Sequence, residues 1–168
     1  WERIQNPKRI LELCRKLLAG YLDKYDDVES IGVTGAMHGI LYTDKEGQAV
    51  SPLYTWQDQR GDQINPESGK SYAKELSEIT GYAMATGFGL TTHYYNTKHH
   101  LIPKGAVSFC TIPDYVAFSI AQEREPLLHQ SMAASLGIYD IQKGCFDTEA
   151  VERAGMDIEM LPRVTKEN

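Results

Sequence analysis

Long hydrophobic runs, closely spaced cysteines and a surplus of positive charge are all missing from this chain of 168 residues. No apolar run approaches the length of about 18 residues that a membrane-spanning helix needs, and the first residues do not resemble a signal peptide. Its three cysteines, Cys14, Cys110 and Cys145, are far apart and have no CxxC or Cys/His spacing typical of a metal site. These absences predict a reduced, cytoplasmic chain with no membrane partner and no metal site.

The charge balance is acidic, with 17 basic and 23 acidic side chains and a net charge of −6. A nucleic-acid-binding domain normally carries a basic patch, so this balance argues against nucleic acid and against an anionic membrane as partners. The length suits one domain with its own core. Nothing in the composition fixes the oligomeric state, and a homo-oligomer stays open.

Apolar spacing predicts alternating helices and strands. The first helix is expected over residues 8–25, after the start signal Asn6–Pro7, with one broad apolar face that includes Leu18. It should pack on a sheet that contains two buried strands, residues 31–34 and 107–111. Further helices are predicted over residues 71–80, 91–102, 113–120 and 148–154, and a further strand over residues 136–140.

Most of the candidate chemistry lies between Ile31 and Arg60. Polar residues 44–47 separate two strand-like runs and predict a β-hairpin. The groups that flank this hairpin are Met37 and His38 on one side and Trp56, Asp58 and Arg60 on the other. An aromatic plate with polar groups around it is typical of a site for a polyhydroxylated ligand. If the hairpin closes, we expect His38 and Asp58 to face one cleft.

Each of these groups also has a purely structural interpretation. Met37 and His38 alone are typical of a core methionine beside a satisfied histidine, but a turn at the carboxyl end of a strand favours a ligand. Asp58 and Arg60 lie two residues apart on an extended segment and share a face. That placement suits a salt bridge at the hairpin exit as well as a ligand site.

The strings TGAMHG and SPLYTWQDQR, followed in order by TGFG, IPDYVAFSI and AASLGIYD, resemble the N-terminal domain of the FGGY carbohydrate kinases. The likeness is strongest to sedoheptulokinase-like and xylulokinase-like members. It implies an α/β domain of the ribonuclease H-like type found in the actin-like ATPase superfamily, here lacking its first strands. It also implies a kinase that uses Mg-ATP to phosphorylate a ketose or a polyol.

The resemblance implies a sugar pocket as well. Met37 and His38 match the pair that contacts the sugar in this family, and Trp56, Asp58 and Arg60 match a motif beside the pocket. His93 falls where the glycerol kinase branch has a substrate-contacting tyrosine, although a partly exposed helix histidine is an equally open interpretation. Gln130 stands where many members have an aspartate, which leaves the identity of the sugar open.

Several parts of a kinase are missing from the sequence. There is no Asp-x-Gly-Thr string for a phosphate-binding hairpin and no ATP-binding domain, and the one Gly-Asp pair, Gly61–Asp62, is not where the family has its catalytic aspartate. The chain also starts at Trp1 rather than at a methionine. We therefore expect a partial domain that supplies a sugar pocket, binds no cofactor and has no kinase activity by itself, the catalytic aspartate lying beyond residue 168. The alternative is a non-catalytic sugar-binding or interaction module.

Overall fold

Eight short strands and six α-helices make up the part of the chain that the computed structural model describes, residues 1–167. The first half contains β1 (Ile4–Gln5), α1 (Pro7–Leu22), β2 (Leu41–Thr43), β3 (Leu53–Tyr54), α2 (Tyr72–Thr80) and α3 (Gly89–Lys98). The second half contains β4 (Ser108–Cys110), α4 (Ile112–Ile120), β5 (Leu127–His129), α5 (Gln130–Ser135), β6 (Tyr139–Asp140), β7 (Cys145–Phe146), α6 (Thr148–Arg153) and β8 (Arg163–Thr165).

The predicted hairpin is present and closes on itself. Its turn is fixed by Gly47 N–H, which donates to the Asp44 carbonyl at 2.9 Å, and its arms meet where Ile40 pairs with Tyr54. The outgoing arm, β2, runs antiparallel to β4, with Tyr42 opposite Phe109. This pairing confirms the predicted strand at residues 107–111, and β1 adds to the return arm by pairing with β3.

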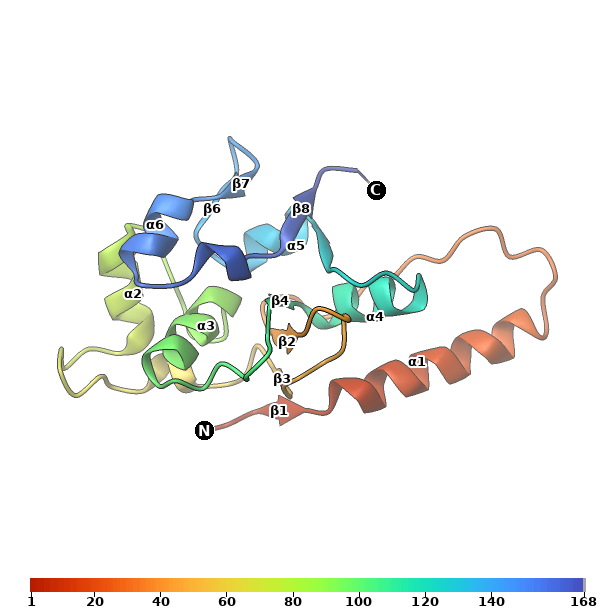
Figure 1. Ribbon diagram of the computed structural model, residues 1–168, viewed down its shortest axis with the longest axis horizontal. Helices are drawn as coiled ribbons and strands as arrows, with labels where there is room; N and C mark the ends of the chain where they lie inside the picture. Colours follow the sequence, from red (N-terminus) through yellow and green to blue (C-terminus); the bar gives the residue numbers. More distant parts are fainter. Residues whose placement is uncertain (168) are drawn as a thin grey trace.

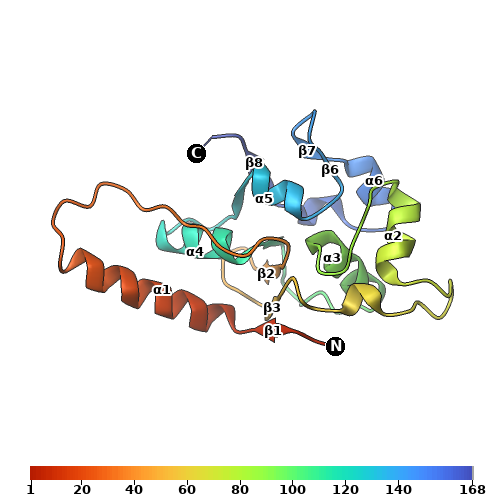
Figure 2. The same cartoon turned by 180° about the vertical axis from the view of Figure 1, so that it is seen from behind.

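The core lies between this hairpin and the helices. Helix α3 lies in the middle, with α2 and α6 beyond it on one side and the β2–β4 pair on the other (Figures 1 and 2), and its residues from Gly89 to Asn96 are all buried. The largest fully buried apolar side chains include Tyr42, Tyr94, Phe109, Leu128 and Leu136. Because α3 is surrounded, its polar side chains must find partners inside the protein.

Three helices have nearly the predicted limits, and two elements differ. Helices α2, α4 and α6 match the predictions, and Ser71 Oγ caps α2 by accepting from Lys74 N–H at 3.3 Å. Helix α3 begins two residues earlier than predicted and ends at Lys98. The strand predicted over residues 136–140 shortens to β6 because Gly137 and Ile138 have φ values of 91° and 49°, outside the extended region.

Helix α1 forms, but the prediction that its broad apolar face packs on a sheet is wrong. Its start is capped by Asn6, whose Oδ1 accepts from Arg9 N–H at 3.1 Å. Only Pro7 and Leu11 of this helix are buried, while Leu17 is 65% exposed. Its one helical neighbour in close contact is α4 (Figure 1), so a narrow stripe is covered rather than a whole face.

The strand predicted at residues 31–34 is also wrong. This segment has no strand or helix, and Ile31 and Val33 are 50% and 40% exposed. In both views the chain leaves the end of α1 in a wide arc and then returns past α4 to the hairpin (Figures 1 and 2). A strand needs a neighbouring strand to pair its backbone N–H and C=O groups, and no strand of the described chain pairs with these residues.

This placement changes the stability expected of variants in α1. Leu11→Ala should cost about 2–5 kcal/mol because Leu11 is buried, whereas Leu18→Ala, at a half-buried position, should cost no more than about 1 kcal/mol. Urea unfolding of the two variants would measure the difference, with Leu13→Ala, at an exposed position of the same helix, as the control. Equal losses for Leu11→Ala and Leu18→Ala would show that the whole face is buried in solution.

Candidate functional site

The turn that enters the hairpin fixes His38 in an unusual conformation. Its φ is +75°, in the left-handed region that a residue with a side chain rarely adopts. The next residue must be glycine, because a Cβ at Gly39 would lie 2.5 Å from the Tyr54 carbonyl oxygen. The imidazole of His38 stacks on the ring of Phe88, with centroids 4.7 Å apart and planes 6° apart.

Ser135, at the end of α5, determines how the His38 ring is protonated. His38 N–H donates to Ser135 Oγ at 3.3 Å, and His38 Nδ1 lies 2.6 Å from the Ser135 carbonyl oxygen. A carbonyl oxygen only accepts hydrogen bonds, so Nδ1 carries a proton. In the neutral ring, Nε2 is then the acceptor. The half-buried His38 can therefore accept a hydrogen bond from a hydroxyl group.

Met37 and Trp56 lie beside this turn and line one cavity. The cavity has a volume of about 100 Å³, and Gly39, Thr55 and Gln57 also line it. The side chains of Met37 and Trp56 are 45% and 54% exposed. Sites that enclose a small molecule usually measure about 300–1,000 Å³. Only part of a sugar would therefore fit into this cavity, and the rest would lie over the exposed side chains.

A larger hollow lies elsewhere. Its volume is about 710 Å³, and it runs between residues 4–8 and residues 49–52. No predicted site residue lines it, and Lys8 is the one charged group on its wall. The hollow therefore contains none of the groups expected to bind the sugar.

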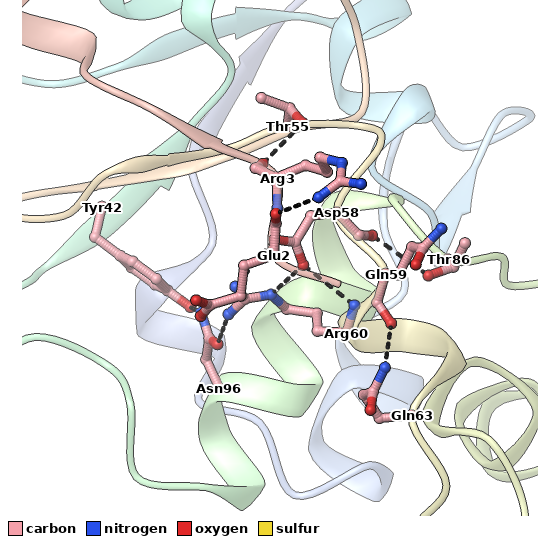
Figure 3. A network of polar contacts seen from close by, with 10 residues as sticks. All are labelled: Glu2, Arg3, Tyr42, Thr55, Asp58, Gln59, Arg60, Gln63, Thr86 and Asn96. Carbon is pink, nitrogen blue, oxygen red and sulfur yellow. Dashed lines mark hydrogen bonds and ion pairs between the residues drawn. The ribbon is translucent and has the colours of Figure 1, made fainter.

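Asp58 and Arg60 lie inside the protein, 0% and 1% exposed. Arg60 donates to both Asp58 oxygens, from Nε at 2.6 Å and from Nη2 at 3.2 Å, and Asp58 Oδ2 also accepts from Arg3 N–H at 3.0 Å (Figure 3). The guanidinium lies over the Tyr54 ring, 4.0 Å from its centroid. The prediction that Asp58 and His38 face one cleft is therefore wrong, and the salt bridge at the hairpin exit is the arrangement present.

His93 is fully buried in α3 and lines none of these cavities. The position of His93 therefore fits neither of the two earlier interpretations, a partly exposed helix histidine or a ligand contact. Tyr42 Oη accepts from Asn96 Nδ2 at 3.2 Å and shares a hydrogen bond with His93 Nδ1, 2.9 Å away. The other ring nitrogen of His93, Nε2, has no hydrogen-bond partner among the described residues. Burial lowers the pKa of His93 to about 4, so the ring is neutral near pH 7.

These contacts join into a buried polar chain that the sequence did not reveal. Arg60 Nη1 donates to Asn96 Oδ1 at 2.6 Å, which links the Asp58–Arg60 pair through Asn96 and Tyr42 to His93 (Figure 3 shows all but His93). The available signal was the spacing of His93 and Asn96, three residues apart on one face of a predicted helix. Tyr42 gave no signal, because an apolar strand residue and a hydrogen-bonded one look alike in sequence.

Two further classes of site find no support in the described residues. None of the helices traced over residues 1–167 is both long and apolar enough to cross a membrane. Nor do three His, Cys, Asp or Glu side chains come together there in a way that could hold a metal ion.

Known proteins resemble the chain over nearly all of its length. Sedoheptulokinase from Mus musculus is 32% identical over 98% of this chain and 37% of that protein. Xylulose kinase from Staphylococcus xylosus is 25% identical over 92% of this chain and 32% of that protein. The chain thus spans about a third of the length of these curated relatives.

Solved structures confirm the predicted fold class. A xylulose kinase from Lactobacillus acidophilus matches with a TM-score of 0.79 at 17% identity, over 98% of this chain and 34% of that chain. Glycerol kinase from Plasmodium falciparum matches with a TM-score of 0.72. The sequence pattern of the FGGY family of carbohydrate kinases, N-terminal domain, matches residues 1–168. The chain therefore belongs to the FGGY family of carbohydrate kinases and carries the α/β fold of its N-terminal domain.

Proposed function

We propose that this chain supplies the sugar-binding part of a cytoplasmic kinase that phosphorylates a ketose of the sedoheptulose or xylulose type, or a polyol. Relatives named sedoheptulokinase and xylulose kinase support the substrate class. The observation that carries the proposal is the pairing of two unlike surfaces at the hairpin entrance. The exposed Trp56 and Met37 offer an apolar face. His38 does not line the cavity itself, but it follows Met37 in the chain and offers a ring acceptor fixed by Ser135.

Such a surface suits a sugar for a chemical reason. A sugar has carbon faces that pack on an aromatic ring and hydroxyl groups that donate hydrogen bonds. In this proposal the indole of Trp56 covers a carbon face, Met37 adjusts to its outline, and His38 Nε2 accepts from a hydroxyl. These residues bind and orient the sugar and take no part in proton transfer.

The nucleotide does not fit the described residues. Mg-ATP would supply the phosphoryl group to the kinase, and its site needs oxygen ligands for the metal together with donors for the phosphates. Among the described residues no three His, Cys, Asp or Glu side chains come together to hold a metal ion, and the sequence has no Asp-x-Gly-Thr string for a phosphate-binding hairpin. We therefore propose that residues 1–168 form a partial N-terminal domain, and that the phosphate-binding hairpin, the catalytic aspartate and the ATP domain belong to other parts of a longer protein.

The proposal is tested by measuring ADP release from the full-length protein with ATP, Mg²⁺ and a panel of ketoses and polyols. Sugar-dependent release is expected from the full-length protein and none from residues 1–168 alone, because the transfer needs parts that this segment lacks. Release from residues 1–168 alone would overturn the proposal of a partial domain. Sugar binding by the full-length protein without ADP release would instead favour a non-catalytic sugar-binding module.

The role of His38 has a separate test in the full-length protein. His38→Ala should raise the KM for the sugar about tenfold and leave the KM for ATP unchanged, because the residue serves only the sugar side. His100→Asn is the matched control, since His100 is exposed and also has a positive φ, which asparagine tolerates. An equal rise in both KM values for His38→Ala would count against a sugar contact.

A further inference from the structure

We propose that Asp58 and Arg60 are positioning residues, whose buried ion pair holds the turn that presents Trp56 to the sugar. The inference rests on the function proposed above and assigns these two residues a task other than ligand contact. Among the described residues, the hydrogen-bond partners of the Asp58 carboxylate are all protein N–H groups, from Arg60 and Arg3. Its charge is balanced inside the protein and is not directed at the cavity.

Trp56 lies within a tight turn whose ends are both anchored. Asp58 N–H donates to the Thr55 carbonyl at 3.0 Å and closes the turn. Thr55 is tied to Arg3, the residue before β1, since its N–H and its Oγ1 donate to the Arg3 carbonyl at 3.0 and 2.8 Å. Arg3 N–H in turn donates to Asp58, so Arg3 holds both ends of the turn. The indole between these anchors is 54% exposed.

Close backbone packing also restricts this turn. Gly87 has a φ of +82°, and a Cβ there would lie 2.0 Å from the Trp56 carbonyl oxygen. On the other side, Gly39 approaches Tyr54 and Thr55 so closely that no side chain fits between them. An exposed side chain on a backbone held in this way loses little further freedom when a ligand packs on it, which favours binding.

Arg60 connects the turn to the interior. Its fork holds both Asp58 oxygens, and its remaining arm donates to Asn96 Oδ1 in α3 at 2.6 Å. A planar guanidinium reaches these acceptors at once, whereas the single ammonium group of lysine does not. Loss of one arm would release the turn without removing the positive charge. The expected consequence is a displaced indole, not a missing sugar contact.

A double-mutant cycle on the full-length protein tests this inference. Trp56→Ala and Arg60→Lys are each expected to raise the sugar KM about tenfold and to leave the ATP KM unchanged. In the Trp56→Ala background, Arg60→Lys should raise the sugar KM no further, because its effect passes through the indole. Should Arg60→Lys fail to fold, Asn96→Ala removes one partner of Arg60 and leaves the ion pair, and the same lack of additivity is expected.

Leu128→Ala serves as the stability control. Leu128 is fully buried in β5, so its replacement should lower stability without changing the sugar KM. Additive effects of Trp56→Ala and Arg60→Lys would overturn the positioning role, since they would mean that Arg60 acts on the sugar independently of Trp56. An unchanged sugar KM for Trp56→Ala alone would instead remove Trp56 from the proposed sugar site, and the positioning role with it.

Discussion

Arg60→Ala is expected to lower the free energy of unfolding by about 3–5 kcal/mol. The change leaves the Asp58 carboxylate fully buried. Its remaining hydrogen-bond donors are the backbone N–H groups of Arg3 and of residue 60. A buried charge without a counter-charge is far more costly than the pair itself, because water no longer solvates it. Urea unfolding of wild type and variant measures the loss, provided that the free energy of unfolding depends on urea concentration with the same slope in both.

Two further variants serve as controls for this measurement. Arg9→Ala breaks an ion pair with Glu12 whose side chains are 66% and 67% exposed, so it should cost less than about 1 kcal/mol. The double change Asp58→Leu with Arg60→Met removes both charges together and should recover part of the loss. A loss below about 1 kcal/mol for Arg60→Ala would mean that water reaches Asp58 in solution.

Acid should destabilise the protein through His93, by up to roughly 3 kcal/mol between its two pKa values. Burial lowers the pKa of His93 from 6.5 to about 4 in the folded chain. Between these values the unfolded chain binds a proton that the folded chain excludes. Stability on this account is complete above pH 6.5 and falls as the pH drops towards 4. Unfolding midpoints in urea over this range measure the slope.

Protonation of Asp114 changes the free energy of unfolding in the opposite direction to protonation of His93, so the two effects must be measured separately. Burial raises the pKa of Asp114 from 3.8 to about 6, so the folded chain holds a proton that the unfolded chain releases in this window. Its contribution to stability is therefore lost as the pH rises from 3.8 through 6. Asp114→Asn should make the loss in acid steeper, and His93→Gln should flatten it. An unchanged slope in His93→Gln would show that His93 does not exclude the proton.

Local sequence patterns predicted most helices and the hairpin correctly, but they predicted less well how these elements pack against one another. The hairpin, α2, α4 and α6 follow from turn residues, caps and apolar spacing, all of which are local. Residues 31–34 have the right alternation for a strand and do not form one, because pairing depends on a second segment that lies elsewhere. For the same reason the apolar spacing of α1 predicted a helix correctly but could not say how much of its face is covered.

The candidate site was also predicted only in part, because local spacing does not show which side chains are buried. A two-residue spacing put Asp58 and Arg60 on one face, but whether that face meets ligand or core depends on Asn96 and Arg3, which are distant in sequence. Trp56, two residues before Asp58, is 54% exposed, because the chain turns between them. Sequence thus identified the residues of the region, and only tertiary contacts separate those that are exposed from those that support them.

At His38 the backbone conformation lowers stability while it places the imidazole that we propose contacts the sugar. A side chain at a φ of +75° costs about 1–3 kcal/mol that glycine would not. A redesign that selected only for thermal stability would therefore favour glycine here, and would discard the imidazole that Ser135 and Phe88 hold in place. Engineering for robustness should leave this residue fixed and seek its gains elsewhere, such as on the exposed side of α1.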